Sequence, residues 1–325
     1  MYQICRAAST QNQTVLFAEA TFLDLAAEPM YRMGMTHDLQ TLPDDLTTAL
    51  RAGRPLTLPT RRLGHPLRYL PIVPSTQPLV HIAAQQGAGD GFVLLTDAQT
   101  AGKGRLGRVW QAPSGSSLLL SMLFRPALSA PQGALGALSA LGAPQGPRLT
   151  MCVGLGAAAA VEEVTGLPVQ LKWPNDLLLH GKKLAGVLTE TQLEGDRIAY
   201  AVVGLGLNVN LALPADHELA PTAISLSQAL GQPVSRLALL QALLRHIEDH
   251  YTRLQAGHSP YAAWAQRMAY YGQTVQVTLP DTTLTGTVAG VNPDGALLVQ
   301  DAAGLTHTVW AGDVLLLHKK IADDR

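Results

Sequence analysis

The stretch that decides the fold of this chain is Lys172-Trp173-Pro174-Asn175-Asp176, which Lys183-Leu184-Ala185-Gly186 follows seven residues later. Its polar groups lie between two runs, 169–173 and 183–191, that are apolar enough to be buried strands. Pro174 cannot donate to a strand ladder, so we expect the first strand to end there and Asn175-Asp176 to form a turn. The turn is either a plain strand ending or a site where Asn175 and Asp176 hold Mg²⁺ or phosphate while Lys172 meets a second anion.

Strand and helix signals continue on both sides of this stretch. Apolar runs predict further strands at 69–73, 91–96, 117–125 and 198–210, and capping and periodicity predict helices at 75–84, 150–165, from Ser235 and from Ser259-Pro260. Because strands follow one another with few helices between them, we expect a mixed or antiparallel sheet flanked by helices, an α+β fold.

The pattern of apolar and turn residues changes at two places along the chain. After Tyr271, short alternating runs separated by turn signals such as Asn292-Pro293-Asp294-Gly295 predict a small C-terminal β-barrel over 271–325. Residues 67–270 form the expected main domain. Residues 1–66 show only a weak helical stretch at 44–52 and no helix-turn-helix pattern, so their role stays open and DNA binding is not expected.

Composition limits the classes of function. The chain has 325 residues, 47% of them hydrophobic, and a net charge of −1, which argues against bulk electrostatic binding to nucleic acid. It has only two cysteines, and we read no secretory signal and no uninterrupted membrane-spanning segment. We therefore expect a cytoplasmic protein that does not bind membranes.

A second unusual stretch is Gly102-Lys103-Gly104-Arg105-Leu106-Gly107-Arg108-Val109-Trp110. Its glycines let the backbone approach a ligand closely, and its cations can neutralise carboxylate and phosphate. The alternative is a solvated basic hairpin turn. The stretch is not a GxxxxGK[ST] phosphate loop, because no Lys-Ser or Lys-Thr follows the glycines.

Lys183 and Asn208 are further candidates. A lysine that enters an apolar site needs an anion to offset its desolvation, so Lys183 is either a ligand contact or one of two solvated lysines beside Lys182. In 204–210, glycines indicate that a strand passes close to another group, and Asn208 can meet a ribose or phosphate. His246 and His250 are spaced i, i+4, but no third metal ligand is evident, so we expect no metal there.

Together these segments resemble the biotin protein ligase family, the biotin–[acetyl-CoA-carboxylase] ligases. The resemblance covers roughly residues 67–320 and rests on segments whose order and spacing match the family: Ser75-Thr76, 97–110, 172–176, 183–186 and 204–210. It implies a catalytic domain shared with lipoate ligases and an SH3-like C-terminal barrel. It also implies two half-reactions, in which biotin and MgATP give biotinyl-5′-AMP and a lysine of biotin carboxyl carrier protein then takes the acyl group.

The resemblance also implies roles for single residues. Lys183 would bridge the biotin carboxylate and the α-phosphate, with Arg105 as the second catalytic residue. The implied biotin contacts are Ser75, Thr76, Gln99, Gly102, Lys103, Arg105, Lys183 and Gly186. The implied ATP contacts are Lys103, Arg105, Arg108, Trp110, Asn175, Lys183 and Asn208, with Asp176 as a magnesium partner.

Three departures from the family pattern matter. Lys103 stands where the family usually has arginine, the closing segment 312–318 lacks the usual terminal arginine, and residues 1–66 do not resemble the winged helix of the repressor–ligases. We therefore expect a monofunctional ligase, with a homodimer possible. The alternatives are a lipoate–protein ligase on the same fold and a biotin-responsive transcriptional repressor.

Overall fold

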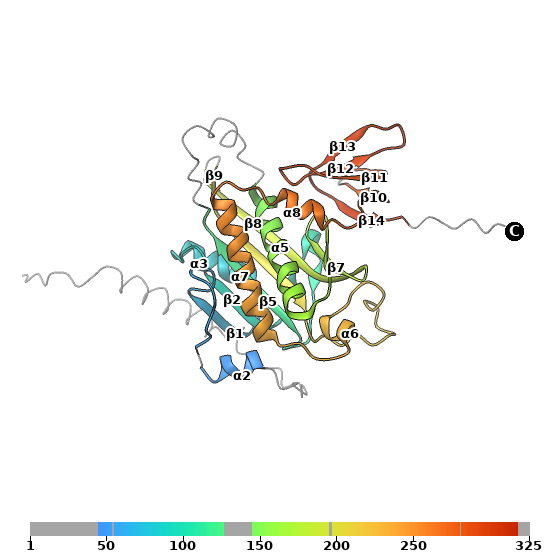
Figure 1. Ribbon diagram of the computed structural model, residues 1–325. Helices are drawn as coiled ribbons and strands as arrows, with labels where there is room; N and C mark the ends of the chain where they lie inside the picture. The colour runs from blue at the N-terminus through green and yellow to red at the C-terminus, as the bar shows by residue number, and fades with distance from the viewer. Residues whose placement is uncertain (1–44, 54, 127–144, 195–196, 280, 318–325) are drawn as a thin grey trace, which may run out of the picture.

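The protein is built around a mixed seven-stranded sheet, seen in a computed structural model that describes residues 45–53, 55–126, 145–194, 197–279 and 281–317 (Figure 1). The strand order is β1-β2-β5-β9-β8-β7-β6. Only β1 and β2 pair in parallel; all the other neighbours are antiparallel, as the order of the predicted strands indicated. The strands are β1 Leu67–Val73, β2 Val93–Gln99, β5 Ser117–Phe124, β6 Gln170–Lys172, β7 Asp176–Leu179, β8 Lys182–Glu194 and β9 Arg197–Asn208.

Helices cover both faces of this sheet, because its central strands are apolar on both sides. In β2, Val93 and Leu95 belong to the large core cluster, whereas Leu94 belongs to a second cluster on the opposite face. The helices α5 (Gln145–Thr165) and α7 (Arg236–Gln255) pack on each other over the first face, and α3 (Thr76–Gln85) covers the second (Figure 1). The side chain of Ser235 accepts the Ala238 N–H and so caps α7, as the sequence predicted.

A second, five-stranded antiparallel sheet follows the short helices α6 (Leu226–Leu230) and α8 (Tyr261–Gln266). Its order is β13-β12-β11-β10-β14. The strands are β10 Thr274–Thr278, β11 Thr283–Val291, β12 Leu297–Gln300, β13 Thr306–Val309 and β14 Asp313–Leu316. Trp173 Nε1 donates to the Gly295 carbonyl at 2.9 Å, which attaches this sheet to the β6–β7 hairpin, and Arg148 of α5 pairs with Asp294 at 2.7 Å. We keep the boundary between residues 270 and 271 as the proposed division between the two domains predicted as 67–270 and 271–325.

The structure corrects the sequence-based expectation at two strand ends. Asp176 is not in a turn: it is the first residue of β7, a strand that the sequence analysis missed, and it pairs with Lys172 across a hairpin whose turn is 173–175. The reason is that Leu177 to Leu179 supply three buried side chains after the turn. Strand β2 also continues past Thr96 to Gln99, which brings Gln99 beside α3.

Part of the N-terminal extension belongs to the main body. Helix α2 (Asp45–Arg51) contacts α7, and Leu46 and Leu63 are fully buried in the main core. A buried polar cluster joins these elements: Arg236 Nη2 donates to Asp97 at 3.0 Å, and Arg236 Nη1 donates to the Ser117 carbonyl at 2.9 Å. The Tyr69 hydroxyl also donates to Asp97, and burial with this bond raises the pKa of Tyr69 to about 12.

This cluster predicts a large stability loss when its cation is removed. Arg236→Met removes the buried guanidinium partner of Asp97 and leaves only the exposed Arg51, 3.5 Å away, so we expect the free energy of unfolding to fall by about 3 kcal/mol. Urea unfolding measures this change. Arg253→Met is the matched control, because Arg253 is exposed on the same helix and its loss should change stability by less than about 0.5 kcal/mol. Equal effects of the two substitutions would contradict the assignment.

Candidate active site

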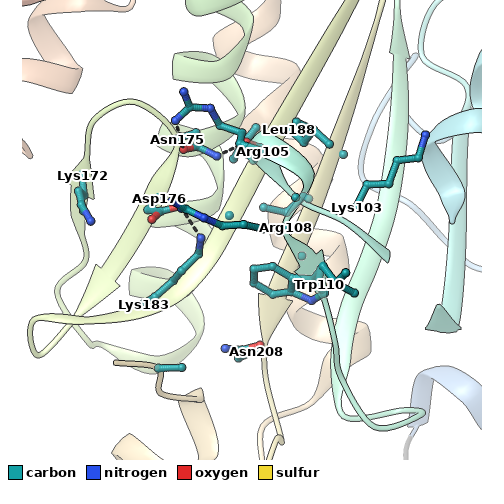
Figure 2. A pocket seen from close by; sticks show the side chains of 18 of the residues that line it. Lys103, Arg105, Arg108, Trp110, Lys172, Asn175, Asp176, Lys183, Leu188 and Asn208 are labelled. Carbon is teal, nitrogen blue, oxygen red and sulfur yellow. Dashed lines mark hydrogen bonds and ion pairs between the residues drawn. The ribbon is translucent and has the colours of Figure 1, made fainter. Parts of the chain in front are cut away.

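A cavity of about 710 Å³ lies between the middle of the first sheet, the loop 102–110, the β6–β7 hairpin and the edge of the second sheet. Twelve of the thirteen site residues predicted from the sequence line it, drawn in part in Figure 2: Ser75, Thr76, Gln99, Lys103, Arg105, Arg108, Trp110, Asn175, Asp176, Lys183, Gly186 and Asn208. Gly102 does not line it. That glycine is buried against the Trp110 carbonyl and the Gln99 side chain, where an added Cβ would meet both.

One end of the cavity is polar and buried. Gln99 Oε1 accepts the Thr76 N–H at 2.8 Å, and the Thr76 and Ser121 hydroxyls are 2.7 Å apart. Ser121 Oγ also donates to Gln77 Oε1 at 3.1 Å. The sequence analysis missed Gln77 and Ser121, because a buried glutamine in a helix and a serine in an apolar strand carry no pattern of their own. This end offers several fixed hydrogen-bonding groups for a compact polar ligand.

The Trp110 indole lies over two glycines of the sheet. Gly186 and Gly206 are Cα partners in β8 and β9, and a Cβ on Gly206 would lie 2.5 Å from Trp110 Cε2. A Cβ on Gly186 would lie 3.2 Å from the same ring. The Trp110 Nε1–H is buried and has no acceptor in the described part of the chain. Close approach of the Trp110 ring therefore explains Gly206, and close approach of the Gln77 side chain explains Gly204 in the same strand.

Lys183 lines the cavity and forms an ion pair with another of the predicted site residues. Its ammonium is 2.7 Å from Asp176 Oδ1 and 5.6 Å from the centre of the Trp110 ring (Figure 2). The Asp176 carboxylate holds Lys183 in this structure, and its predicted role as a magnesium partner stays a prediction. Asp176 and Lys183 come from the neighbouring strands β7 and β8, in which Asp176 is the Cα partner of Gly186 and Lys183 that of Leu178.

The loop 102–110 is a short hairpin that contacts the second sheet. It consists of β3 Gly102–Lys103, the 3-10 turn η2 Arg105–Gly107 and β4 Val109–Trp110. Arg105 Nη1 is 3.4 Å from Asp313 Oδ1, and its guanidinium also donates to the Gly312 carbonyl. Arg108 pairs with the other oxygen of Asp313. Asp313 thus holds two loop cations against β14, a contact that the sequence could not reveal because it joins residues about 200 positions apart.

The two asparagines of the predicted set are also held by backbone. Asn175 Nδ2 donates to the Val187 carbonyl at 2.7 Å, and its oxygen accepts from Arg105 at 3.3 Å. Asn208 is buried, and its Nδ2 donates to the Ile224 carbonyl at 3.2 Å. Lys103 is exposed, and Figure 2 shows its amine directed away from the Lys183–Asp176 pair.

Positive charge exceeds negative charge around the cavity. Among the described residues, its lining contains five cationic side chains and two carboxylates, Asp176 and Asp313. Such a lining suits a ligand with several negative charges. No group of three or more His, Cys, Asp or Glu side chains suited to a metal ion occurs in the part of the chain that the structure describes. His246 Nε2 is 2.7 Å from Glu163.

Comparisons with known proteins agree with this geometry. Residues 69–208 match the biotin/lipoate A/B protein ligase family, and residues 270–317 match the biotin protein ligase C-terminal domain. The bifunctional ligase/repressor BirA of Bacillus subtilis is 32% identical over 80% of this chain and 76% of its own length. This chain belongs to the biotin protein ligase family. The family prediction made from the sequence is confirmed.

Two further relatives support the membership. The biotin–[acetyl-CoA-carboxylase] ligase of Mycobacterium tuberculosis is 33% identical over 70% of this chain and 80% of its own. Among solved structures, the biotin protein ligase of Aquifex aeolicus in complex with biotin and ATP matches with a TM-score of 0.63 and 28% identity, covering 77% of this chain and 98% of that one. In the residues searched, no helix is long and apolar enough to cross a membrane.

The stacking of Trp110 on the glycine pair predicts a specific coupling. Gly206→Ala places a methyl group inside the indole, so we expect the free energy of unfolding to fall by about 1–3 kcal/mol. In a Trp110→Ala background most of that loss should disappear, because the clash is gone. Gly89→Ala is the control, since nothing lies within 4 Å of its added Cβ. Equal losses in both backgrounds, measured by urea unfolding, would contradict the contact.

The contact between the loop and Asp313 predicts a change in accessibility. Asp313→Asn removes the charge that holds Arg105 and Arg108, so trypsin should cleave after these arginines roughly threefold to tenfold faster at low salt, the range expected for partly exposed pairs. Mass spectrometry of the fragments locates the cuts. Asp301→Asn is the control, because Asp301 pairs with His307 in the same sheet. No acceleration in the Asp313 variant would mean that the loop is held by other contacts.

Proposed function

We propose that this protein activates biotin with ATP to give biotinyl-5′-AMP and transfers the biotinyl group to a lysine of a biotin carboxyl carrier protein. Family membership supports the ligase activity. The observation that carries the residue assignments is one cavity in which a buried polar end, the Trp110 ring and Lys183 follow one another. Biotin has a polar ureido ring, an apolar chain and a carboxylate, which suit that order of surroundings.

The roles of the polar end follow from its donors and acceptors. Ser75, Thr76 and Gln99 are buried or half-buried side chains that would hydrogen-bond the ureido ring. Gly186, which lines the cavity, would leave room for the thiophane ring and the valeryl chain, whereas Gly102 lies behind the cavity wall. The carboxylate at the end of that chain then reaches Lys183.

In the first half-reaction two anions must meet. A carboxylate oxygen of biotin attacks the α-phosphorus of ATP, the bond to the bridging oxygen breaks, and pyrophosphate leaves. The two reactants repel each other unless a cation lies between them. Lys183 would leave Asp176 and bridge the carboxylate and the α-phosphate, while Arg105 and Arg108 turn from Asp313 to the phosphates. Trp110 and Asn208 would contact the adenosine. Asn175 would lie beside the phosphates, and Lys103 would cover the phosphates from the loop 102–110.

In the second half-reaction the amine of the carrier lysine, as the free base, attacks the mixed-anhydride carbonyl. The carbonyl–phosphate bond breaks, AMP leaves and a proton is released to solvent. Lys183 and Arg105 would stabilise the charge that returns to the phosphate. The loop 102–110 would cover the adenylate until the carrier arrives and so protect it from water.

Mg²⁺ would arrive with the ATP phosphates. Magnesium is usually held by one or two protein carboxylates together with substrate phosphates, and the cavity supplies Asp176 and Asp313. Asp176 fits this role only after Lys183 moves to the reactants, because the two are in contact here. Bound magnesium would neutralise phosphate charge.

We further propose a cytoplasmic, monofunctional ligase whose protein partner is the biotin carboxyl carrier domain of a carboxylase, with a homodimer as a possible assembly. A lipoate–protein ligase is the rival enzyme, and a biotin-responsive repressor is the rival binding protein. The loop of glycines and cations and the C-terminal sheet domain favour biotin. Measuring which acid, biotin or lipoate, drives ATP–pyrophosphate exchange decides between the two enzymes, and exchange with lipoate alone would overturn the proposal.

Lys183→Met tests the mechanism. Without a cation between the reactants, ATP–pyrophosphate exchange should fall by about a hundredfold to a thousandfold or more, the scale for loss of one charge-stabilising group. Lys182→Met is the matched control, because its amine donates to the Ala220 carbonyl outside the reacting groups and exchange should stay within about twofold. Near-normal exchange by a folded Lys183→Met variant would remove Lys183 from the mechanism.

A further inference from the structure

Lys172 is a cation of the cavity lining that the functions above do not use. Its side chain is half-buried, and it makes no ion pair or hydrogen bond within the described part of the chain. Lys183 is paired with Asp176, and Arg105 and Arg108 share Asp313. Lys103 also lacks an ion pair there, but it is exposed to solvent and needs none.

The backbone holds Lys172 in a fixed position. It is the last residue of β6 and the Cα partner of Asp176 in β7. On one side, Leu171 N donates to the Arg267 carbonyl at 2.8 Å; on the other, Trp173 is buried and bonded to the Gly295 carbonyl. Hydrogen bonds on both sides of Lys172 therefore hold the hairpin that carries it, whereas Arg105 and Arg108 lie on a loop.

The surroundings of Lys172 do not provide it with a counter-ion of its own. Burial lowers the pKa of its ammonium, and the attraction of Asp176 offsets this only in part. Asp313 attracts the ammonium from β14, while Lys183 and Arg108 repel it. Both carboxylates are already in contact with other cations. A half-buried ammonium in this state gains most from an arriving anion.

The position of Lys172 indicates which anion it binds. Figure 2 shows Lys172 on the far side of the Lys183–Asp176 pair from Trp110. The polar end of the cavity lies on the Trp110 side, since Gln99 contacts Gly102 and Gly102 pairs with Trp110. In phosphoryl and nucleotidyl transfer, the attacking and leaving oxygens lie roughly in line on opposite sides of the phosphorus. If the attacking carboxylate comes from the polar end, the leaving group points toward the β6–β7 hairpin.

We propose that Lys172 binds the β- and γ-phosphates of ATP and the pyrophosphate that leaves in the first half-reaction. This inference rests on the proposed function and adds a substrate-binding residue to it. Arg105 and Arg108 would approach the polyphosphate from the loop, and Lys172 would meet it from the hairpin. Lys172 is not needed once pyrophosphate has gone, so it acts in one half-reaction only.

The test separates the two half-reactions with Lys172→Met in the full-length protein. ATP–pyrophosphate exchange reports the first half, and transfer from purified biotinyl-5′-AMP to a carrier domain reports the second. We expect the KM for ATP and the inhibition constant of inorganic pyrophosphate each to rise about tenfold or more, the scale of one lost charge-assisted contact. Transfer from the preformed adenylate should stay within about twofold of the wild type.

Two further variants make the result specific. Lys172→Arg keeps the charge and should recover much of the lost ATP affinity, which a purely structural role in the hairpin would not require. Lys182→Met removes a lysine from β8 whose amine donates to the Ala220 carbonyl, and it should leave both half-reactions within about twofold.

Three results would overturn the inference: an unchanged KM for ATP in Lys172→Met, an equal loss in both half-reactions together with lower stability, or a loss confined to transfer. The last would mean that Lys172 acts on the carrier lysine. Wild-type protein that catalyses no exchange with biotin would instead overturn the proposed function, so the two failures are distinguishable.

Discussion

Charge repulsion is the constraint on which this site depends. Activation of a carboxylate by ATP brings two anionic reactants to bonding distance, and the protein must supply the cations between them. The cavity does this with five cationic side chains against two carboxylates among the residues described. Three of those cations are paired with the carboxylates: Asp176 holds Lys183, and Asp313 holds the two loop arginines. The site therefore keeps its cations in place by pairs that the substrate can replace.

The two sheets divide this work. The first sheet fixes Lys183, Asp176 and the glycine pair under Trp110 through strand register, which leaves little freedom in their spacing. The second sheet contributes Asp313 and the Gly312 carbonyl, which hold the loop over the cavity. The hairpin 170–179 lies between them and is attached to the second sheet through Trp173. The C-terminal sheet is thus part of the cavity wall and not only an appended unit.

Much of this arrangement could be predicted from the sequence, and the failures have physical causes. The mixed sheet, the long helix capped by Ser235 and the β-rich C-terminus follow from periodicity and turn residues. Strand β7 was missed because it is only four residues long and begins at Asp176, a residue type that favours turns. The pairing of Asp313 with Arg105 could not be foreseen, since sequence patterns report local structure. The reason for a glycine at position 206 is the Trp110 ring that lies on it, a contact that sequence patterns do not report.

The most direct measurement is a crystal structure of the protein with a non-hydrolysable analogue of biotinyl-5′-AMP. The account predicts one ligand across the cavity, with its ureido ring at Thr76 and Gln99 and its adenosine at Trp110. Lys183 should have left Asp176 and should contact the group that replaces the acyl phosphate. A ligand bound elsewhere, or one whose phosphate analogue contacts neither Lys183 nor Arg105, would contradict the claim that this cavity brings the two anions together.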